Sequence, residues 1–159
     1  MRLYQMEPGK PQCLLYSAAI LLDVPPRRLI EEIGHDGMEI RWPELKAPGC
    51  YRSHHIQEII DCFIRRGYVL VPIEREPVQA PCSGVPICYT YEHVKARDRF
   101  EGYFTKPAIV IGKLTSTPHA WVYDGRKSFY DPNGFITDKD DHRYEILESW
   151  NRIKIGKDL

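Results

Sequence analysis

The sequence predicts an α+β protein in which the helices come first and an antiparallel sheet follows. Apolar residues at helical spacing dominate the part before Gly67, and short apolar runs between turn residues dominate the part after Lys106. The 13 prolines indicate a chain divided by turns and short connections rather than a helical bundle. A chain of 159 residues can bury a sizeable core, so we expect a single domain over residues 1–159.

The first elements expected along the chain are a short strand, a turn and a buried helix. Residues 2–5 form the expected strand, and Pro8-Gly9 is a typical turn dipeptide. Residues 12–22 are apolar nearly all round, which predicts a helix buried on most sides, and Pro11 suits its first turn. Cys13 is therefore expected at the N-terminus of this helix.

Two further helices and an irregular segment are expected before the sheet. Residues 26–33 predict a short helix that ends at Gly34. Residues 35–51 have no clear period and contain several glycines and prolines, which is typical of a functional loop. Ser53 is expected to cap a third helix that runs to Arg66 and carries isoleucine and phenylalanine side chains along one face.

The rest of the chain predicts mainly strands. Asp124-Gly125 is a strong tight-turn dipeptide and predicts that the strands on either side of it form a hairpin. Residues 74–86 are expected to form a loop, residues 93–104 a short helix or irregular structure, and residues 144–155 a strand or a short helix. Strands are expected at residues 68–73, 87–91, 107–112, 119–123 and 128–131.

Composition narrows the classes of protein that need to be considered. Lys+Arg and Asp+Glu number 22 each, so we expect no nucleic-acid partner and no membrane partner. No run approaches the roughly 18 apolar residues of a membrane span, and Glu7 and Pro8 stand where a signal peptide has basic residues. The five irregularly spaced cysteines fit reduced thiols, so a cytoplasmic protein with at least one free thiol is expected.

Cys13, His119 and Asp131 are candidates for a nucleophile, its base and the residue that orients the base. An ordinary thiol is only a few per cent ionised at neutral pH, and the unpaired N–H groups of a helix N-terminus stabilise the thiolate. His119 stands where a polar loop passes into an apolar strand, and Asp131 ends the next strand. If strands 119–123 and 128–131 pair through the Asp-Gly turn, their far ends meet and bring His119 beside Asp131.

Each of these residues also has a purely structural interpretation. Cys13 before an apolar helix can be a small buried hydrophobe, and His119 can be a half-exposed residue at a strand end. Asp131 and Asn133 can belong to an Asx turn without any chemical role. Trp121 can shield the His–Asp pair from water or serve as a core residue. Both kinds of interpretation stay open from these residues alone.

Together, Gln5, Cys13 before an apolar helix, His119-Ala-Trp-Val and Tyr-Asp131-Pro resemble the papain-like cysteine peptidase superfamily. The most similar branch comprises the small peptidases that cleave double-glycine leader sequences and their stand-alone relatives in bacteria and phages. The resemblance covers residues 5–134 and implies a papain-like α+β fold, in which the helix carrying Cys13 packs against a C-terminal antiparallel sheet. It also implies that Cys13 is the nucleophile, His119 the base, Asp131 the orienting residue and Gln5 an oxyanion-hole donor.

The resemblance implies a hydrolase that cleaves a peptide or related amide bond through a thioester on Cys13, with a peptide or protein substrate as partner and no cofactor. Two positions depart from the family pattern. Leu14 follows the cysteine where that branch usually has glycine, and Gln5 precedes it by eight residues, slightly more than usual, so Gln12 is an alternative donor. Acyl transfer, isopeptide cleavage and a catalytically inactive binding or adaptor module are alternative functions. The sequence does not predict the oligomeric state.

A small zinc protein is a further alternative. Soft ligands occur in Cys50-x3-His54-His55-x6-Cys62 and in Cys82-x5-Cys88. Zinc sites favour more closely spaced ligand pairs, so buried core cysteines are expected here rather than a metal site. In the segment 35–51, four residues are candidates to line a cleft: Asp36, Glu39, Arg41 and Trp42.

Overall fold

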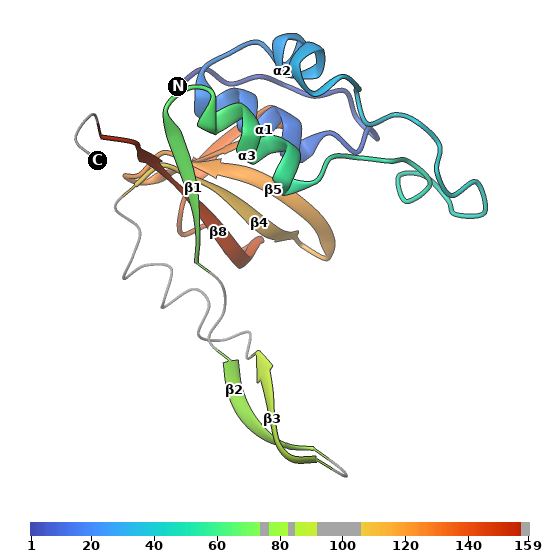
Figure 1. Ribbon diagram of the computed structural model, residues 1–159, viewed down its shortest axis with the longest axis vertical. Helices are drawn as coiled ribbons and strands as arrows, with labels where there is room; N and C mark the ends of the chain where they lie inside the picture. The colour runs from blue at the N-terminus through green and yellow to red at the C-terminus, as the bar shows by residue number, and fades with distance from the viewer. Residues whose placement is uncertain (74–76, 83–84, 92–105, 157–159) are drawn as a thin grey trace.

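The computed structural model describes residues 1–73, 77–82, 85–91 and 106–156, and in this part of the chain three helices pack on a six-stranded antiparallel sheet (Figure 1). The helices are α1 (Cys13–Leu22), α2 (Pro26–Ile33) and α3 (Ile56–Ile64). In spatial order the sheet contains β1 (Tyr68–Ile73), β8 (Tyr144–Lys154), β4 (Ala108–Leu114), β5 (Thr117–Tyr123), β6 (Ser128–Asp131) and β7 (Phe135–Asp138). Strands β2 (Pro77–Cys82) and β3 (Val85–Tyr91) form a separate two-stranded sheet. The predicted α+β class is confirmed.

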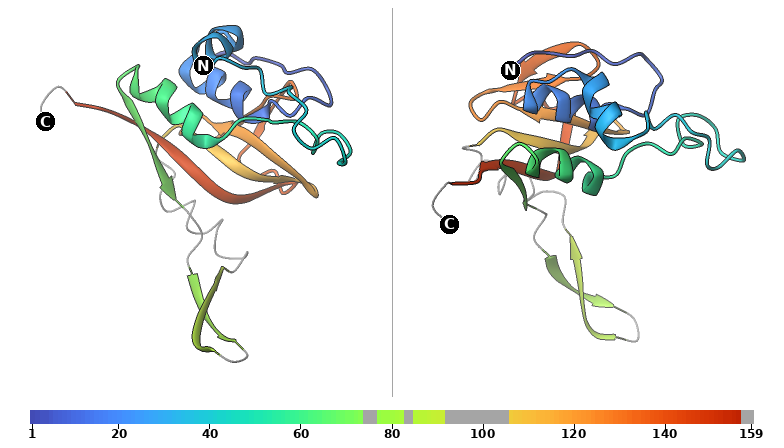
Figure 2. Two further views of the ribbon diagram at one scale, coloured as in Figure 1. Left: turned by 45° about the vertical axis from the view of Figure 1, so that its right-hand side comes forward. Right: turned by 45° about the horizontal axis from the view of Figure 1, so that its top comes forward.

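Helix α1 is the central element of the helical layer, which covers one face of the sheet (Figure 2). It begins at Cys13 as predicted, with Gln12 as its N-cap, and Asp23 ends it in a left-handed conformation. Ala18 and Ala19 are fully buried, and their small side chains allow close packing against the sheet. α1 therefore holds the backbone of Cys13 rigidly against β5.

The two faces of the sheet carry different clusters of side chains. Because side chains alternate along a strand, Val122 of β5 packs with the helices while its neighbours Trp121 and Tyr123 point to the opposite face. There, Trp121 and Tyr123 join Phe129 and Tyr144 in a buried aromatic cluster.

Among the described residues, no helix combines the length and the apolar character that crossing a bilayer requires.

The hairpin predicted at Asp124-Gly125 is present between β5 and β6. The Asp124 backbone N–H donates to the Ser128 carbonyl oxygen at 3.1 Å, and the Asp124 carboxylate accepts three backbone hydrogen bonds within the turn. Gly125 has a φ of +80°, and a Cβ there would lie 2.8 Å from the Pro107 nitrogen, so glycine is required. The hairpin sets Val122 opposite Tyr130 and so brings the far ends of both strands together.

Two predictions for the part of the chain before α3 are wrong. Residues 2–5 form no strand: the segment makes a single backbone bond to the sheet region, from the Met6 N–H to the Pro132 carbonyl oxygen at 2.8 Å. Ser53 does not cap α3, because its hydroxyl donates to the Pro11 carbonyl oxygen at 3.0 Å. The N-cap is His55 instead, whose backbone N–H is held by the Glu58 carboxylate at 2.9 Å.

The structure also contains strands that the sequence did not define. Residues 74–86 were expected to form a loop, but β2 lies within them. β7 follows the Asp131–Gly134 turn as an additional edge strand. The segment 144–155, for which a strand and a helix were both open, forms β8 between β1 and β4. The expected structure of residues 93–104 lies outside the described residues.

Gly112 allows β8 to approach β4 closely. The pairing of the two strands shifts register between Ile111 and Gly112. A Cβ at Gly112 would overlap the backbone carbonyl oxygen of Glu145 and lie 2.9 Å from the Trp121 ring. The absence of a side chain therefore lets the start of β8, with Tyr144, reach the interior beside β5 and β6.

Candidate active site

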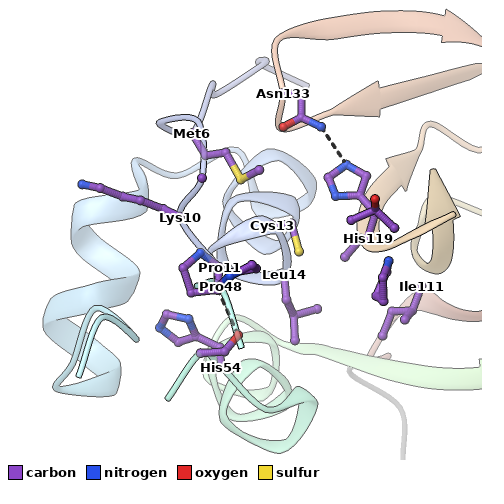
Figure 3. A pocket seen from close by; sticks show the side chains of 15 residues that line it. Met6, Lys10, Pro11, Cys13, Leu14, Pro48, His54, Ile111, His119 and Asn133 are labelled. Carbon is purple, nitrogen blue, oxygen red and sulfur yellow. Dashed lines mark hydrogen bonds between the residues drawn. The ribbon is translucent and has the colours of Figure 1, made fainter. Parts of the chain in front are cut away.

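Cys13, His119 and Asp131, which lie far apart in the sequence, meet at one end of the sheet. Cys13 is the first residue of α1, His119 lies on β5 and Asp131 ends β6. Figure 3 shows Cys13 and the His119 ring as neighbours at the head of the pocket, and Cys13 is a hydrogen-bond partner of His119. His119 Nε2 lies 2.8 Å from Asp131 Oδ1, and both side chains are buried. The geometry is that of a nucleophile, a base and an orienting carboxylate.

Both oxygens of the Asp131 carboxylate accept hydrogen bonds. It has no exposed surface; Oδ1 accepts from His119 and from the Asn133 backbone N–H at 2.8 Å, and Oδ2 accepts from the Tyr144 hydroxyl at 2.7 Å. Burial alone raises the pKa of Asp131, but the His119 and Tyr144 interactions outweigh it and lower the pKa below its ordinary value. The Asx turn and the orienting role are therefore two parts of one arrangement, since Asp131 serves both.

The hydrogen bond to Asp131 determines which His119 nitrogen is available for chemistry. Nε2 carries one hydrogen, and Asp131 accepts it, so Nδ1 is left for Cys13. The Asn133 side-chain nitrogen lies 3.3 Å from the same Nε2 and covers that edge of the ring. Burial lowers the pKa of His119, but hydrogen bonds with Asp131 and Cys13 and the negative charge of both raise it to about 9. A protonated His119 at neutral pH follows.

The raised pKa of His119 can be measured directly. We expect the His119 ring resonances to titrate near pH 9, and an Asp131→Asn variant to shift the midpoint toward about 6.5, because it removes the carboxylate charge. Since the folded-state pKa is raised, His119 stabilises the fold fully below about pH 6.5, and this contribution is lost as the pH rises through about 9. Asp61→Asn, on the exposed surface of α3, is the control. A wild-type midpoint below pH 7 would contradict the arrangement.

Trp121 fulfils both roles considered for it. It has no exposed surface and packs edge-on against Phe129 and Tyr144, as a core residue does. Its ring also lies over His119, with 6.1 Å between the ring centroids and 26° between the planes. The core aromatic cluster thus forms the dry floor under the His119–Asp131 pair, which strengthens their electrostatic interaction.

An open pocket of about 440 Å³ begins at Cys13 and His119 (Figure 3). The polar side chains of its lining include Asn133, Ser53 and Lys10. The remaining lining is mostly apolar and comes from the start of α1, from β4 and β5, and from the segments before α1 and α3: Met6, Pro11, Leu14, Pro48, Ile111, Pro118 and Ala120. Leu14, the residue that departs from the family pattern, therefore lines the pocket with its side chain.

The wall opposite His119 is built by the segment before α3. Pro48 and His54 line the pocket, whereas the four residues proposed to do so, Asp36, Glu39, Arg41 and Trp42, are absent from its lining. His54 is buried and stacks on His35, with 4.8 Å between the ring centroids. Burial, the largest influence on it, lowers the pKa of His54. A neutral, packed imidazole is therefore part of this wall.

Gln12 and Gln5, the two candidate oxyanion donors, have different surroundings. The Gln12 side chain is buried and donates to the Asp36 carbonyl oxygen at 2.8 Å, so it holds the 35–51 segment instead of facing the pocket. The Gln5 amide nitrogen lies 3.5 Å from the Asn133 carbonyl oxygen, and its side chain packs against Gly134. Gln5 thus lies on the turn that follows Asp131, next to the site but outside the pocket lining.

The residues considered as zinc ligands are not assembled into a metal site in the described part of the chain. No group of three or more His, Cys, Asp or Glu side chains with metal-binding geometry occurs there. Cys50 and Cys62 are buried free thiols, and Cys62 donates to the Glu58 carbonyl oxygen at 3.6 Å. Burial raises the pKa of Cys62, as expected of an unreactive core thiol. The side chains of Cys82 and Cys88 lie outside this description.

Among the described residues, Tyr144 is the one side chain hydrogen-bonded to Asp131 that the sequence did not suggest. It lies 13 residues beyond Asp131, in a segment whose secondary structure was open. No local motif marks it, since its contact depends on the position of β8 within the sheet.

Comparison with known proteins adds no further residue: no protein-family model, curated protein or solved structure matches this chain.

Proposed function

We propose that this protein is a cysteine hydrolase of the papain-like type, which cleaves a peptide or related amide bond with Cys13, His119 and Asp131. The observation that carries the proposal is the buried Asp131–His119 pair whose free ring nitrogen faces Cys13 at the head of an open pocket. A cysteine that serves only for packing does not require a protonated histidine next to it. Nor does it require a hydrogen-bonded carboxylate that holds this histidine. The order of the three residues along the chain and the α+β architecture fit the same family.

The proposed reaction has two halves. In the first, the Cys13 thiolate attacks the substrate carbonyl carbon, and the tetrahedral intermediate collapses as protonated His119 gives its proton to the leaving nitrogen. The products of this half are an amine and a thioester on Cys13. In the second half, His119 takes a proton from a water molecule that attacks the thioester, which releases a carboxylic acid and restores the thiolate. Asp131 keeps the ring oriented throughout.

The N-terminus of α1 offers donors for the oxyanion of the tetrahedral intermediate. The first N–H groups of a helix have no intrahelical acceptor, and the Gln12 side chain makes no capping bond to them. These N–H groups surround Cys13 and can stabilise developing negative charge. Gln5, which lies on the turn that follows Asp131, is the proposed side-chain donor. A Gln5→Ala variant that keeps the wild-type kcat would remove Gln5 from this role.

The pocket favours an apolar substrate segment. Its lining next to Cys13 is mainly aliphatic and proline side chains, and about 440 Å³ is room for several side chains rather than for two glycines alone. We therefore propose a peptide or protein substrate with bulky apolar residues near the scissile bond. Acyl transfer to an amine and isopeptide cleavage use the same groups, and product analysis with wild-type protein distinguishes them from hydrolysis.

The reactivity of Cys13 tests the site without knowledge of the substrate. We expect iodoacetamide to alkylate Cys13 at pH 6–7 at least about 10-fold faster in the wild type than in His119→Asn, because a protonated His119 favours the thiolate. At pH 10 the two rates should converge, since His119 has then lost its extra proton in the wild type. Peptide mapping by mass spectrometry assigns the labelled cysteine, and circular dichroism confirms that the variant is folded.

Comparing Cys13 in the two proteins excludes the explanation that it reacts faster only because the other cysteines are buried. Cys50 and Cys62 are buried and react slowly in any case, so the informative comparison is Cys13 with itself in the two proteins. Equal Cys13 rates at pH 6–7 in wild type and variant would contradict an assisted nucleophile. That result would favour a binding or adaptor module that has the site geometry without the activity.

A further inference from the structure

We propose that Tyr144 is a positioning residue of this site, which fixes the Asp131 carboxylate and keeps it ionised by donating a hydrogen bond from its hydroxyl to Oδ2. The inference deepens the proposed function and rests on it for its catalytic meaning, but the contact itself can be tested without any substrate. The Tyr144 hydroxyl lies 2.7 Å from Oδ2, and both side chains are buried.

The two carboxylate oxygens of Asp131 accept hydrogen bonds from different partners. Oδ1 accepts from His119 and from the Asn133 backbone, so it holds the base and the turn. In the described part of the chain, Tyr144 is the only residue recorded to donate to Oδ2. A buried carboxylate oxygen without a donor is costly, and the group escapes this cost by rotating or by taking up a proton. Either response weakens its hold on His119.

The surroundings of Tyr144 leave its ring little freedom to move. It packs edge-on against Trp121, with 4.9 Å between the ring centroids, and lies 5.5 Å from Phe129. β8 places it opposite Leu114 of β4, and the missing side chain of Gly112 allows this approach. The hydroxyl is therefore directed at Oδ2 by the packing of three strands.

The phenol keeps its proton over the whole working range of an enzyme. Burial, followed by the hydrogen bond and charge of Asp131, raises the pKa of Tyr144 well above its ordinary value. Tyr144 is thus a permanent donor that does not titrate together with the catalytic groups. The charged groups that act on Asp131 and Tyr144 are His119 of β5, and Asp141 and Arg143 before β8; Cys13 of α1 acts on the pair through His119.

The inference predicts a change in the acidic limb of the pH dependence. A hydrogen bond to a charged group is worth about one to two pKa units, so Tyr144→Phe should raise the pKa of Asp131 by about that amount. Below the new pKa the carboxylate is neutral, and His119 loses its negatively charged partner. The Cys13 alkylation rate should therefore fall off at a pH about one unit higher than in the wild type.

Tyr123 provides a matched control in the same aromatic cluster. Its side chain is also buried, and its hydroxyl donates to the Arg126 carbonyl oxygen at 2.6 Å, in a turn at the other end of the hairpin. Tyr123→Phe removes the same atom and a buried hydrogen bond of similar length. It should lower the unfolding temperature to a comparable extent and leave the acidic limb where it is in the wild type.

Two measurements on folded wild type, Tyr144→Phe and Tyr123→Phe decide the matter. Carbon-13 NMR of the Asp131 carboxyl carbon gives its titration midpoint, and iodoacetamide labelling gives the acidic limb for Cys13. A midpoint raised in Tyr144→Phe alone supports the inference. An unchanged midpoint in Tyr144→Phe, or an equal shift in Tyr123→Phe, overturns it. If Tyr144→Phe does not fold, 3-fluorotyrosine at position 144, a stronger donor, should move the midpoint downward, and an unmoved midpoint overturns the inference.

The same measurements separate this inference from the proposed function. If the carboxyl midpoint shifts but Cys13 is not activated in the wild type, the Tyr144 contact stands and the hydrolase proposal fails. If Cys13 is activated and its acidic limb does not respond to Tyr144→Phe, the hydrolase proposal stands and the positioning role fails.

Discussion

Replacing Cys13 by alanine is expected to reduce the hydrolysis of apolar peptide substrates by about 10⁴-fold or more, because among the described residues no other thiol lines the pocket beside His119 to form the thioester. The substitution removes one sulfur atom from a half-buried position at the start of α1, so the fold should persist. The measurement is kcat/KM on a library of fluorogenic peptides with bulky apolar residues at each position, compared with a library rich in glycine.

Cys50→Ala is the matched control for this experiment. Cys50 is a buried thiol in the 35–51 segment and does not line the pocket, so its loss should leave kcat/KM within a few-fold of the wild type. Activity retained in Cys13→Ala would show that any observed hydrolysis arises elsewhere. Cleavage confined to the glycine-rich library would contradict the apolar preference inferred from the pocket.

Replacing Asp131 by alanine is expected to lower the free energy of unfolding at pH 7 by about 3–5 kcal/mol and to abolish activity as well. The substitution removes the acceptor of three hydrogen bonds, which come from His119, the Tyr144 hydroxyl and the Asn133 backbone N–H. Removing one partner of a buried network costs more than the pair contributes, because the groups left behind stay desolvated. Urea unfolding of both proteins gives the difference.

The pH dependence of that difference has a defined sign. The pKa of Asp131 is lowered in the folded state, so its stabilising contribution is present above about pH 4 and is lost as the pH falls through the lower folded-state value. The gap between wild type and Asp131→Ala should therefore narrow below pH 4. Asp61→Ala, an exposed aspartate on α3, should change stability by less than about 1 kcal/mol. A gap that is independent of pH would contradict an ionised, buried Asp131.

Local sequence signals accounted for the elements that carry the three candidate catalytic residues. The apolar run after Cys13 predicted α1 because a helix buried on most sides needs no polar face. The Asp-Gly dipeptide predicted the β5–β6 hairpin because few other residues fit that turn. From that hairpin alone, the proximity of His119 and Asp131 followed.

Other local signals were outweighed by contacts made elsewhere in the fold. Ser53 has the chemistry of a helix cap, yet its hydroxyl is bound to the Pro11 carbonyl oxygen, 42 residues away in the sequence. Residues 2–5 have strand character, but the chain there meets the turn after β6 through the Met6 backbone N–H and the Gln5 side chain instead of pairing in the sheet. In both cases a long-range hydrogen bond decided the conformation, and a window of neighbouring residues contains no sign of it.

The sequence by itself determined the α+β class, the helix start at Cys13 and the pairing of His119 with Asp131, because each depends on residues close together in the chain. Only the tertiary structure decided that Cys13 faces His119 and that an apolar pocket opens beside them. It also decided that the Tyr144 hydroxyl donates a hydrogen bond to the second oxygen of the Asp131 carboxylate. The physical reason is the same in each case: these contacts join α1 to β5 and β8 to β6, and the relative positions of these elements are fixed by packing over the whole sheet.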